Sequence, residues 1–176
     1  PDLIDLHAHP FMKIGLGPVF HGNFFGPRRA KKWDDRYYSK INADSLEASG
    51  IAILVLSLYA HPVLCPARKY AIKKQIELAW EFALKSQAWR IVTTPKEARQ
   101  VLEQKKRSII LSLEGAAGIL DTDEDIDDFI GHEGIRIVTP FHLTPDSLGT
   151  PALLGGMRGF LAAPFLPRKS ATSRTE

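Results

Sequence analysis

Four short apolar segments are spaced along the first 142 residues, and each has the length of a β-strand. They are Asp2–His7, Ile51–Leu58, Ser108–Leu113 and Ile135–Phe141. The segment 51–58 is almost continuously apolar and contains β-branched side chains, a pattern typical of a strand that is buried on both faces of a parallel sheet. We therefore predict four parallel strands over these segments.

Helical periodicity fills the intervals between these strands. Apolar residues recur at helical spacing over 67–88, which predicts a long amphipathic helix. The sequence Thr94-Pro95-Lys96-Glu97 predicts a helix start with a capping box, and that helix should run to about residue 105. Shorter helices are predicted over 42–49 and from the acidic segment 121–128, whose carboxylates favour the positive end of a helix dipole.

This alternation of strands and helices predicts an α/β fold with a parallel sheet. Such strands form either an open doubly wound sheet or a (β/α)8 TIM-type barrel. A complete barrel takes about 250 residues, so about four βα units over 1–142 correspond to half a barrel. Residues 143–176 show no further periodic element, and we expect them to form a loop and an irregular basic tail that resembles a truncated or frame-shifted end.

The net charge of +3 lies in that tail. Residues 158–176 contain four basic residues and one acidic residue, so residues 1–157 carry no net charge. Nucleic-acid binding requires a clustered basic face, and we therefore expect no nucleic-acid partner. No apolar run reaches the roughly 18 residues that span a bilayer, so no transmembrane segment is predicted. The single cysteine, Cys65, cannot form an internal disulfide and has no catalytic context.

Candidate chemical groups follow the predicted strands, at the end of a parallel sheet where ligands bind. His7 and His9 are two residues apart, so an extended backbone places both imidazoles on one side, where they can bind one divalent cation such as Zn²⁺. Glu114 ends the third strand, where an unpaired charge is costly and a metal or a basic partner would remove that cost. His142 follows the fourth strand and could be a ligand, a general acid/base or an oxyanion stabiliser.

Each of these residues also has a purely structural interpretation. His7 and His9 could be a hydrogen-bonded pair in a loop, Glu114 a paired structural carboxylate, and His142 a loop histidine bonded to backbone. His61 and His21 are weaker candidates for the same site.

Three stretches of sequence resemble a known family. The opening Asp5-Leu6-His7-Ala8-His9 resembles the amidohydrolase superfamily, whose first strand carries a metal-binding pair. Leu113-Glu114-Gly115, followed by the stretch Gly134–His142 and then Gly149-Thr150-Pro151, resembles the membrane (renal) dipeptidase family. The resemblance covers about residues 2–151. It implies a (β/α)8 barrel with two zinc ions, a carboxylate at Glu114 that bridges them, and a histidine at His142 that contacts the substrate and its tetrahedral intermediate.

Two departures from the family pattern stand out. The family usually has Asp where this chain has His9, and its second metal requires two later histidines together with a later Asp. No histidine follows His142 here, and the last aspartate is Asp146.

Three functional hypotheses follow. The first is a zinc-dependent dipeptidase that acts on small dipeptide-like substrates and is present as an incomplete fragment, with metal ligands His7, His9 and Glu114 and with Glu114 and His142 as the catalytic residues. The second is a catalytically inactive fragment or association partner. The third is a metal-dependent phosphoesterase or deoxyribonuclease. Because half a barrel leaves two strand edges open, we also expect either a homodimer that closes an eight-strand ring or aggregation.

Overall fold

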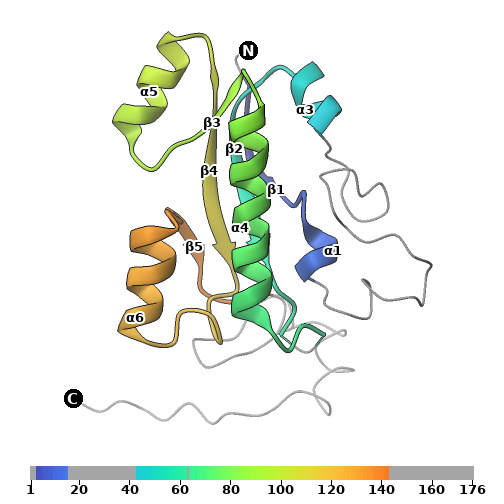
Figure 1. The fold of residues 1–176 in the computed structure, drawn as a ribbon, viewed down its shortest axis with the longest axis vertical. Coiled ribbons are helices and arrows are strands. Elements are labelled where there is room, and N and C mark those ends of the chain that lie inside the picture. The colour runs from blue at the N-terminus through green and yellow to red at the C-terminus, as the bar shows by residue number, and fades with distance from the viewer. Residues whose placement is uncertain (1–2, 16–42, 63, 143–176) are drawn as a thin grey trace, which may run out of the picture.

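The protein folds around one curved, parallel β-sheet (Figure 1). The computed structural model describes residues 3–15, 43–62 and 64–142 of the 176-residue chain. The sheet has the strand order β1-β2-β4-β3, and β5 also pairs with β4. Every pairing is parallel. The strands are β1 (Leu3–Ala8), β2 (Ile51–Tyr59), β3 (Trp89–Ile91), β4 (Arg107–Glu114) and β5 (Ile137–Thr139).

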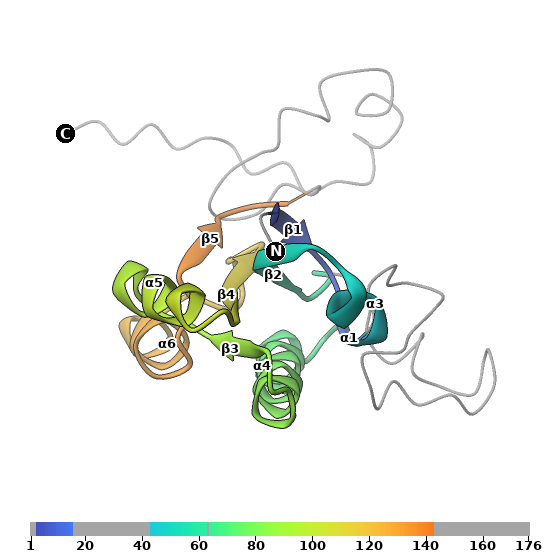
Figure 2. The same ribbon diagram turned by 90° about the horizontal axis from the view of Figure 1, so that it is seen from above.

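Helices lie on the outside of the arc that the strands form (Figure 2). The predicted half of a (β/α)8 barrel is therefore confirmed, with β1, β2, β4 and β5 in the places of four barrel strands. Among the described residues, no helix is long and apolar enough to cross a membrane. The helices are α1 (Met12–Gly15), α3 (Ala43–Ala48), α4 (Arg68–Lys85), α5 (Pro95–Glu103), α6 (Asp123–Ile126) and the π-helix η2 (Asp127–His132).

The short strand β3 was not predicted. It pairs with the amino-terminal part of β4, from Trp89 opposite Arg107 to Ile91 opposite Ile109. Three residues are too few to show a periodicity, and the strand is held by tertiary contacts, because the fully buried Trp89 lies against Phe82 of α4. The predicted strand over 135–141 is shortened to β5, which pairs with the carboxyl-terminal part of β4.

The predicted helix starts are present, with one change in detail. The Thr94 side chain accepts a hydrogen bond from the Glu97 backbone N–H at 3.1 Å, as a capping threonine should. The Glu97 carboxylate reaches back to the backbone N–H of Thr93, at 2.7 Å. A complete capping box occurs instead at the start of α6, between Thr122 and Asp125.

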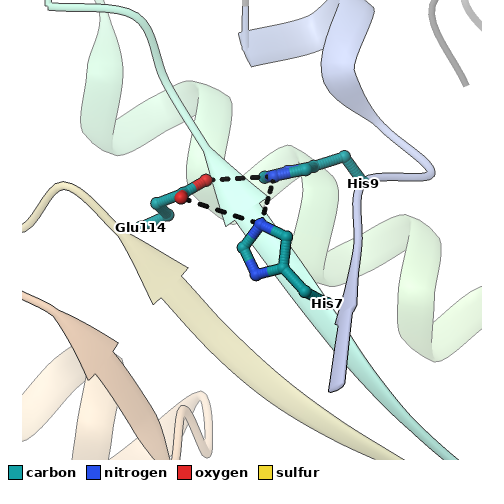
Figure 3. A group of neighbouring side chains, drawn as sticks. All are labelled: His7, His9 and Glu114. Atoms are coloured by element: carbon teal, nitrogen blue, oxygen red, sulfur yellow. Dashed lines mark hydrogen bonds and ion pairs between the residues drawn. The ribbon is translucent and has the colours of Figure 1, made fainter. Parts of the chain in front are cut away.

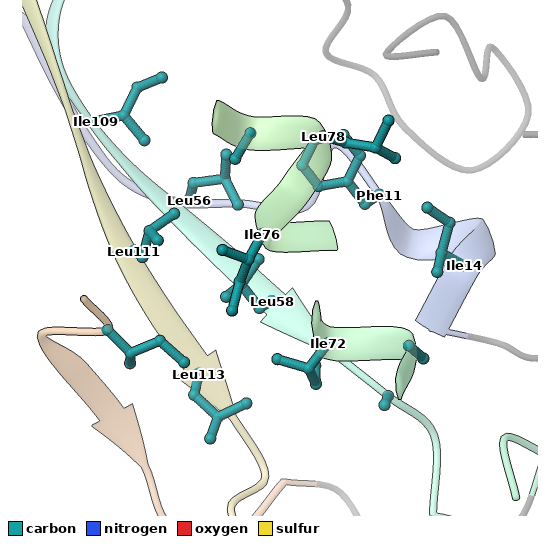
Figure 4. Packing of buried hydrophobic residues seen from close by; sticks show 14 of the residues in the cluster. Phe11, Ile14, Leu56, Leu58, Ile72, Ile76, Leu78, Ile109, Leu111 and Leu113 are labelled. Atoms are coloured by element: carbon teal, nitrogen blue, oxygen red, sulfur yellow. The ribbon is translucent and has the colours of Figure 1, made fainter. Parts of the chain in front are cut away.

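Alternating positions of the two central strands form the core (Figure 4). Leu56 lies opposite Leu111 and Leu58 opposite Leu113 in the β2–β4 register, and all four side chains are fully buried on the side that faces α4. Burying a leucine side chain contributes roughly 1.5–3 kcal/mol. The intervening positions point to the opposite face and become polar toward the strand ends, where Tyr59 lies opposite Glu114. This switch from apolar to polar positions locates the site.

Candidate metal centre

Side chains from β1 and β4 meet at the carboxyl end of the sheet (Figure 3). His7 Nε2 lies 2.9 Å from His9 Nε2. The Glu114 carboxylate faces both rings, with Oε2 at 3.0 Å from His9 Nε2 and Oε1 at 3.7 Å from His7 Nε2. The strand β2 runs between β1 and β4, so these ligands come from strands that do not pair with each other.

A backbone carbonyl sets the orientation of the His9 ring. His9 Nδ1 lies 3.1 Å from the Ser57 carbonyl oxygen. A carbonyl only accepts hydrogen bonds, so Nδ1 carries the proton and a neutral ring presents the Nε2 lone pair to Glu114. Metal-binding histidines are held in this way by a hydrogen bond from the nitrogen that does not bind the metal.

A proton or a cation is needed between His9 Nε2 and Glu114 Oε2. Glu114 is 5% exposed, and its Oε2 has no hydrogen-bond partner among the described residues. Two lone pairs that face each other at 3.0 Å repel unless a proton or a cation lies between them. Ligand atoms of a tetrahedral zinc site are about 3.3 Å apart, close to the separations among His7, His9 and Glu114. These three residues therefore fit a metal ion such as Zn²⁺, and they are a group that could hold one.

His142 lies on the other side of the same carboxylate. Its Nε2 is 3.2 Å from Glu114 Oε1, and its ring packs edge-on against Tyr59 with centroids 5.1 Å apart. Burial lowers the pKa of His142 below its usual value, and the nearby His9 and His7 act in the same direction, although Glu114 opposes them. A neutral imidazole is therefore favoured at this position near pH 7.

The charges around Glu114 favour its ionised form. Burial by itself raises the pKa of this carboxyl, but the contact with His9 and the positive charges that His142, His9 and His7 carry when protonated outweigh it. The net result is a lowered pKa. Glu114 is thus a carboxylate that requires positive charge around it, which protons on the histidines or a metal ion can provide.

The structure brings together the four predicted site residues His7, His9, Glu114 and His142. Their chemical roles remain predictions. His61 lies at the edge of this group, with its ring centroid 6.2 Å from that of Tyr59, and its Nδ1 accepts a hydrogen bond from the Leu64 backbone N–H. His21 and Asp146 lie outside the described residues. Cys65 is buried.

Two neighbouring residues were missed. The Tyr59 ring lies between those of His9 and His142, and burial, followed by the charge of Glu114, raises the pKa of its hydroxyl. Its place at the carboxyl end of β2 was the available signal, because ligand-binding groups gather at that end of a parallel sheet. Gln75 of α4 is buried, and its amide forms two hydrogen bonds with the Tyr59 backbone, which no sequence pattern indicated.

Comparison with known proteins places the fold. No protein-family model matches the chain, and no curated protein matches it. Among solved structures, the chain is similar to the crystal structure of a metallopeptidase, the dipeptidase AC of peptidase family M19, with a TM-score of 0.51 and 16% sequence identity. The similarity covers 60% of this chain and 34% of that protein, so the chain spans about a third of the metallopeptidase. The likeness shows that the half-barrel is shared with a metallopeptidase.

Proposed function

We propose that this chain binds Zn²⁺ through His7, His9 and Glu114 and forms the metal-binding half of a dipeptidase-type hydrolase. The observation that carries the proposal is the convergence of two imidazoles and a buried carboxylate oxygen that lacks a hydrogen-bond partner. The fold that presents them is similar to that of a metallopeptidase.

The roles of the residues follow from their atoms. When bound, zinc supplies the Lewis acidity that activates water and polarises a peptide carbonyl. His9 and His7 hold the ion, and the hydrogen bond to Ser57 fixes the His9 ring in the required tautomer. Glu114 Oε2 lies 3.0 Å from His9 Nε2, and Oε1 lies 3.2 Å from His142 Nε2 and 3.7 Å from His7 Nε2, so both carboxylate oxygens could serve as ligands. His142 Nε2, when protonated, can donate a hydrogen bond to a substrate oxygen.

The described residues offer the ligands of one ion. Within that part of the chain, His7, His9 and Glu114 are the group of three side chains that could hold a metal. A binuclear site requires further ligands, so we propose that the described half binds zinc and a dipeptide-like substrate, while efficient turnover depends on groups outside it. Losing the second ion and its acid–base partner removes contributions each worth about 100-fold or more.

Zinc content and substrate binding test this proposal together. Elemental analysis should find about one zinc per wild-type chain and a loss of that zinc in the double variant His7→Ala, His9→Ala. His132→Ala is a matched control, because this exposed histidine lies at the end of η2. Equal zinc content in the wild type and the double variant would reject the metal site.

Calorimetric titration of a dipeptide panel should show weak binding that requires zinc and is lost in Glu114→Gln. Zinc-dependent binding of phosphodiesters in place of dipeptides would favour the phosphoesterase hypothesis. Binding of neither class, in a protein that retains zinc, would favour an inactive association partner.

A further inference from the structure

Arg68, at the start of α4, connects the ends of two sheet strands. Its Nε donates to the carbonyl oxygen of Ala60, just after β2, at 3.0 Å. Its Nη2 donates to the carbonyl oxygen of Gly115, just after β4, at 3.0 Å, and its Nη1 donates to the carbonyl oxygen of Ala117. One guanidinium thus holds three backbone carbonyls from two loops, an arrangement that the fixed fork of five N–H groups permits.

The loop after β4 is shaped to receive this guanidinium. Gly115 and Gly118 have φ values of +82° and +76°, a region that favours glycine. A Cβ atom at Gly118 would lie 2.8 Å from Arg68 Nη1, so any side chain there would displace the guanidinium. The absence of a side chain at Gly118 therefore leaves the space that the Arg68 head occupies.

The same contacts determine where the Glu114 carboxylate lies. Gly115 directly follows Glu114, and its carbonyl is held by Arg68 while its backbone N–H donates to the Thr139 carbonyl of β5 at 2.9 Å. On the neighbouring strand, Gln75 holds both backbone groups of Tyr59, the residue opposite Glu114. Arg68 and Gln75 are seven residues apart on α4 and therefore lie on one helix face, two turns apart.

We propose that Arg68 is a positioning residue for the metal site, which fixes Glu114 against His7 and His9 by holding the loop carbonyls that follow β2 and β4. The inference rests on the proposed zinc site. The hydrogen bonds from Arg68 to three backbone carbonyls, and not its positive charge, hold the Glu114 carboxylate in place.

The test compares two arginines that each make three hydrogen bonds to backbone carbonyls. Arg136, just before β5, donates to the carbonyls of Thr93, Ile130 and Ile135, none of which belongs to the loops held by Arg68 or to the candidate site. Arg68→Met and Arg136→Met keep an apolar stem and remove the donors. The full chain is studied in three ways: zinc affinity by competition with a chromophoric chelator, the Co²⁺ absorption spectrum, and the thermal midpoint of the metal-free protein.

We expect Arg68→Met to weaken zinc affinity by about 10- to 100-fold and to change the Co²⁺ spectrum. Arg136→Met should lower the thermal midpoint and leave both metal readouts unchanged. Arg68→Lys keeps the charge but not the fork, so it should weaken zinc binding nearly as much as Arg68→Met. If Arg68→Met does not fold, Arg68→Lys is judged by the same criterion.

Unchanged zinc affinity in the Arg68 variants, an equal loss in Arg136→Met, or full affinity in Arg68→Lys would each overturn the inference while leaving the zinc site standing. A wild-type chain that binds no zinc, or a double histidine variant that keeps it, would overturn the proposed function and this inference with it.

Discussion

Gly15, the last residue of α1, lies against the backbone at the end of β2. A Cβ atom there would come within 1.8 Å of the Tyr59 carbonyl oxygen, and the Gly15 carbonyl already accepts a hydrogen bond from the His61 backbone N–H at 2.6 Å. The contact is between two backbones, so no side chain can rotate away to make room. Gly15 therefore fixes how closely the segment after β1 can approach β2.

The variant Gly15→Ala should be destabilised by roughly 1–3 kcal/mol, because the backbone must shift to accept the methyl group. Gly131→Ala is the control, since a Cβ there meets nothing within 4 Å and alanine favours a helical conformation. Urea unfolding of both variants measures the difference. Equal free energies of unfolding for Gly15→Ala and the wild type would show that the close contact is absent in solution.

The sequence predicted the chemical residues of the site better than the residues that support them. His7, His9 and Glu114 were found because each follows or ends a recognisable strand. Gln75 and Arg68 form hydrogen bonds with backbone groups of other elements. Every residue type has a backbone carbonyl, so the sequence does not indicate which residue will accept such a bond. Tertiary contacts of this kind appear only when the elements are packed together.

Among the helices, the start of α6 depends on one carboxylate. Asp125 accepts hydrogen bonds from the backbone N–H groups of Asp121 and Thr122 and pairs with Lys69 of α4. The hydrogen bond from Lys69 is the main cause that lowers the pKa of Asp125 to about 2. This group stabilises the fold above its unfolded pKa of about 4, and that stabilisation is lost as the pH falls toward 2.

Asp125→Asn should therefore be less stable than the wild type at neutral pH, with a difference that shrinks as the pH decreases from about 4 to 2. Denaturant unfolding across this pH range measures the effect, and Asp123→Asn controls for the loss of one negative charge from the same helical turn. A difference between Asp125→Asn and the wild type that stays constant from neutral pH to pH 2 would contradict the assignment.

The longest helix was predicted well, and the short strand β3 on the amino-terminal part of β4 was missed. The helix α4 spans 18 residues and was predicted within a few residues of its observed ends. β3 has three residues and was not predicted, whereas η2, with six residues, continues the helix predicted from 121–128. The fully buried Phe129 of η2 and Trp89 of β3 belong to the common core, and such burial is a property of the assembled molecule.

The whole half-barrel presents two apolar edges. Leu3, Ile4 and Leu6 of β1 are 58–72% exposed, and Ile137 and Val138 of β5 are about 40% exposed. Among the described residues, β1 pairs with β2 and β5 with β4, each along one edge. A twofold rotation about the barrel axis keeps all strands parallel and brings the β5 edge of one copy to the β1 edge of another. We propose that two copies associate through these edges.

Ile4→Glu should weaken this association by roughly 10-fold or more, because it places a charge in an apolar interface. Leu84→Glu is the matched control, since Leu84 is 81% exposed on α4 and lies away from both edges. Sedimentation velocity over a range of protein concentrations measures the association. A monomer at every concentration, or equal weakening in both variants, would reject association through the β1 edge.

β4 pairs with neighbouring strands on both of its edges. β2 pairs with Ser108 through Glu114, while β3 and then β5 occupy the opposite edge. At the junction of β3 and β5, the carbonyls of Ile109 and Leu111 accept from the backbone N–H groups of Val92 and Arg136, both at 2.9 Å. Amide protons of β4 should therefore exchange with solvent far more slowly than those of β1, which pairs along one edge within the described part of the chain.

The proposed metal ligands thus lie at the carboxyl ends of β4, which pairs along both edges, and of β1, which pairs along one edge among the described residues. Zinc would tie β1 to β4 across β2, so it should slow amide exchange in β1 and leave β4 almost unchanged. Hydrogen–deuterium exchange with and without zinc measures the amide exchange rates of β1 and β4 in one experiment. If zinc does not change amide exchange in β1, the ion does not connect β1 to β4, however much zinc the protein binds.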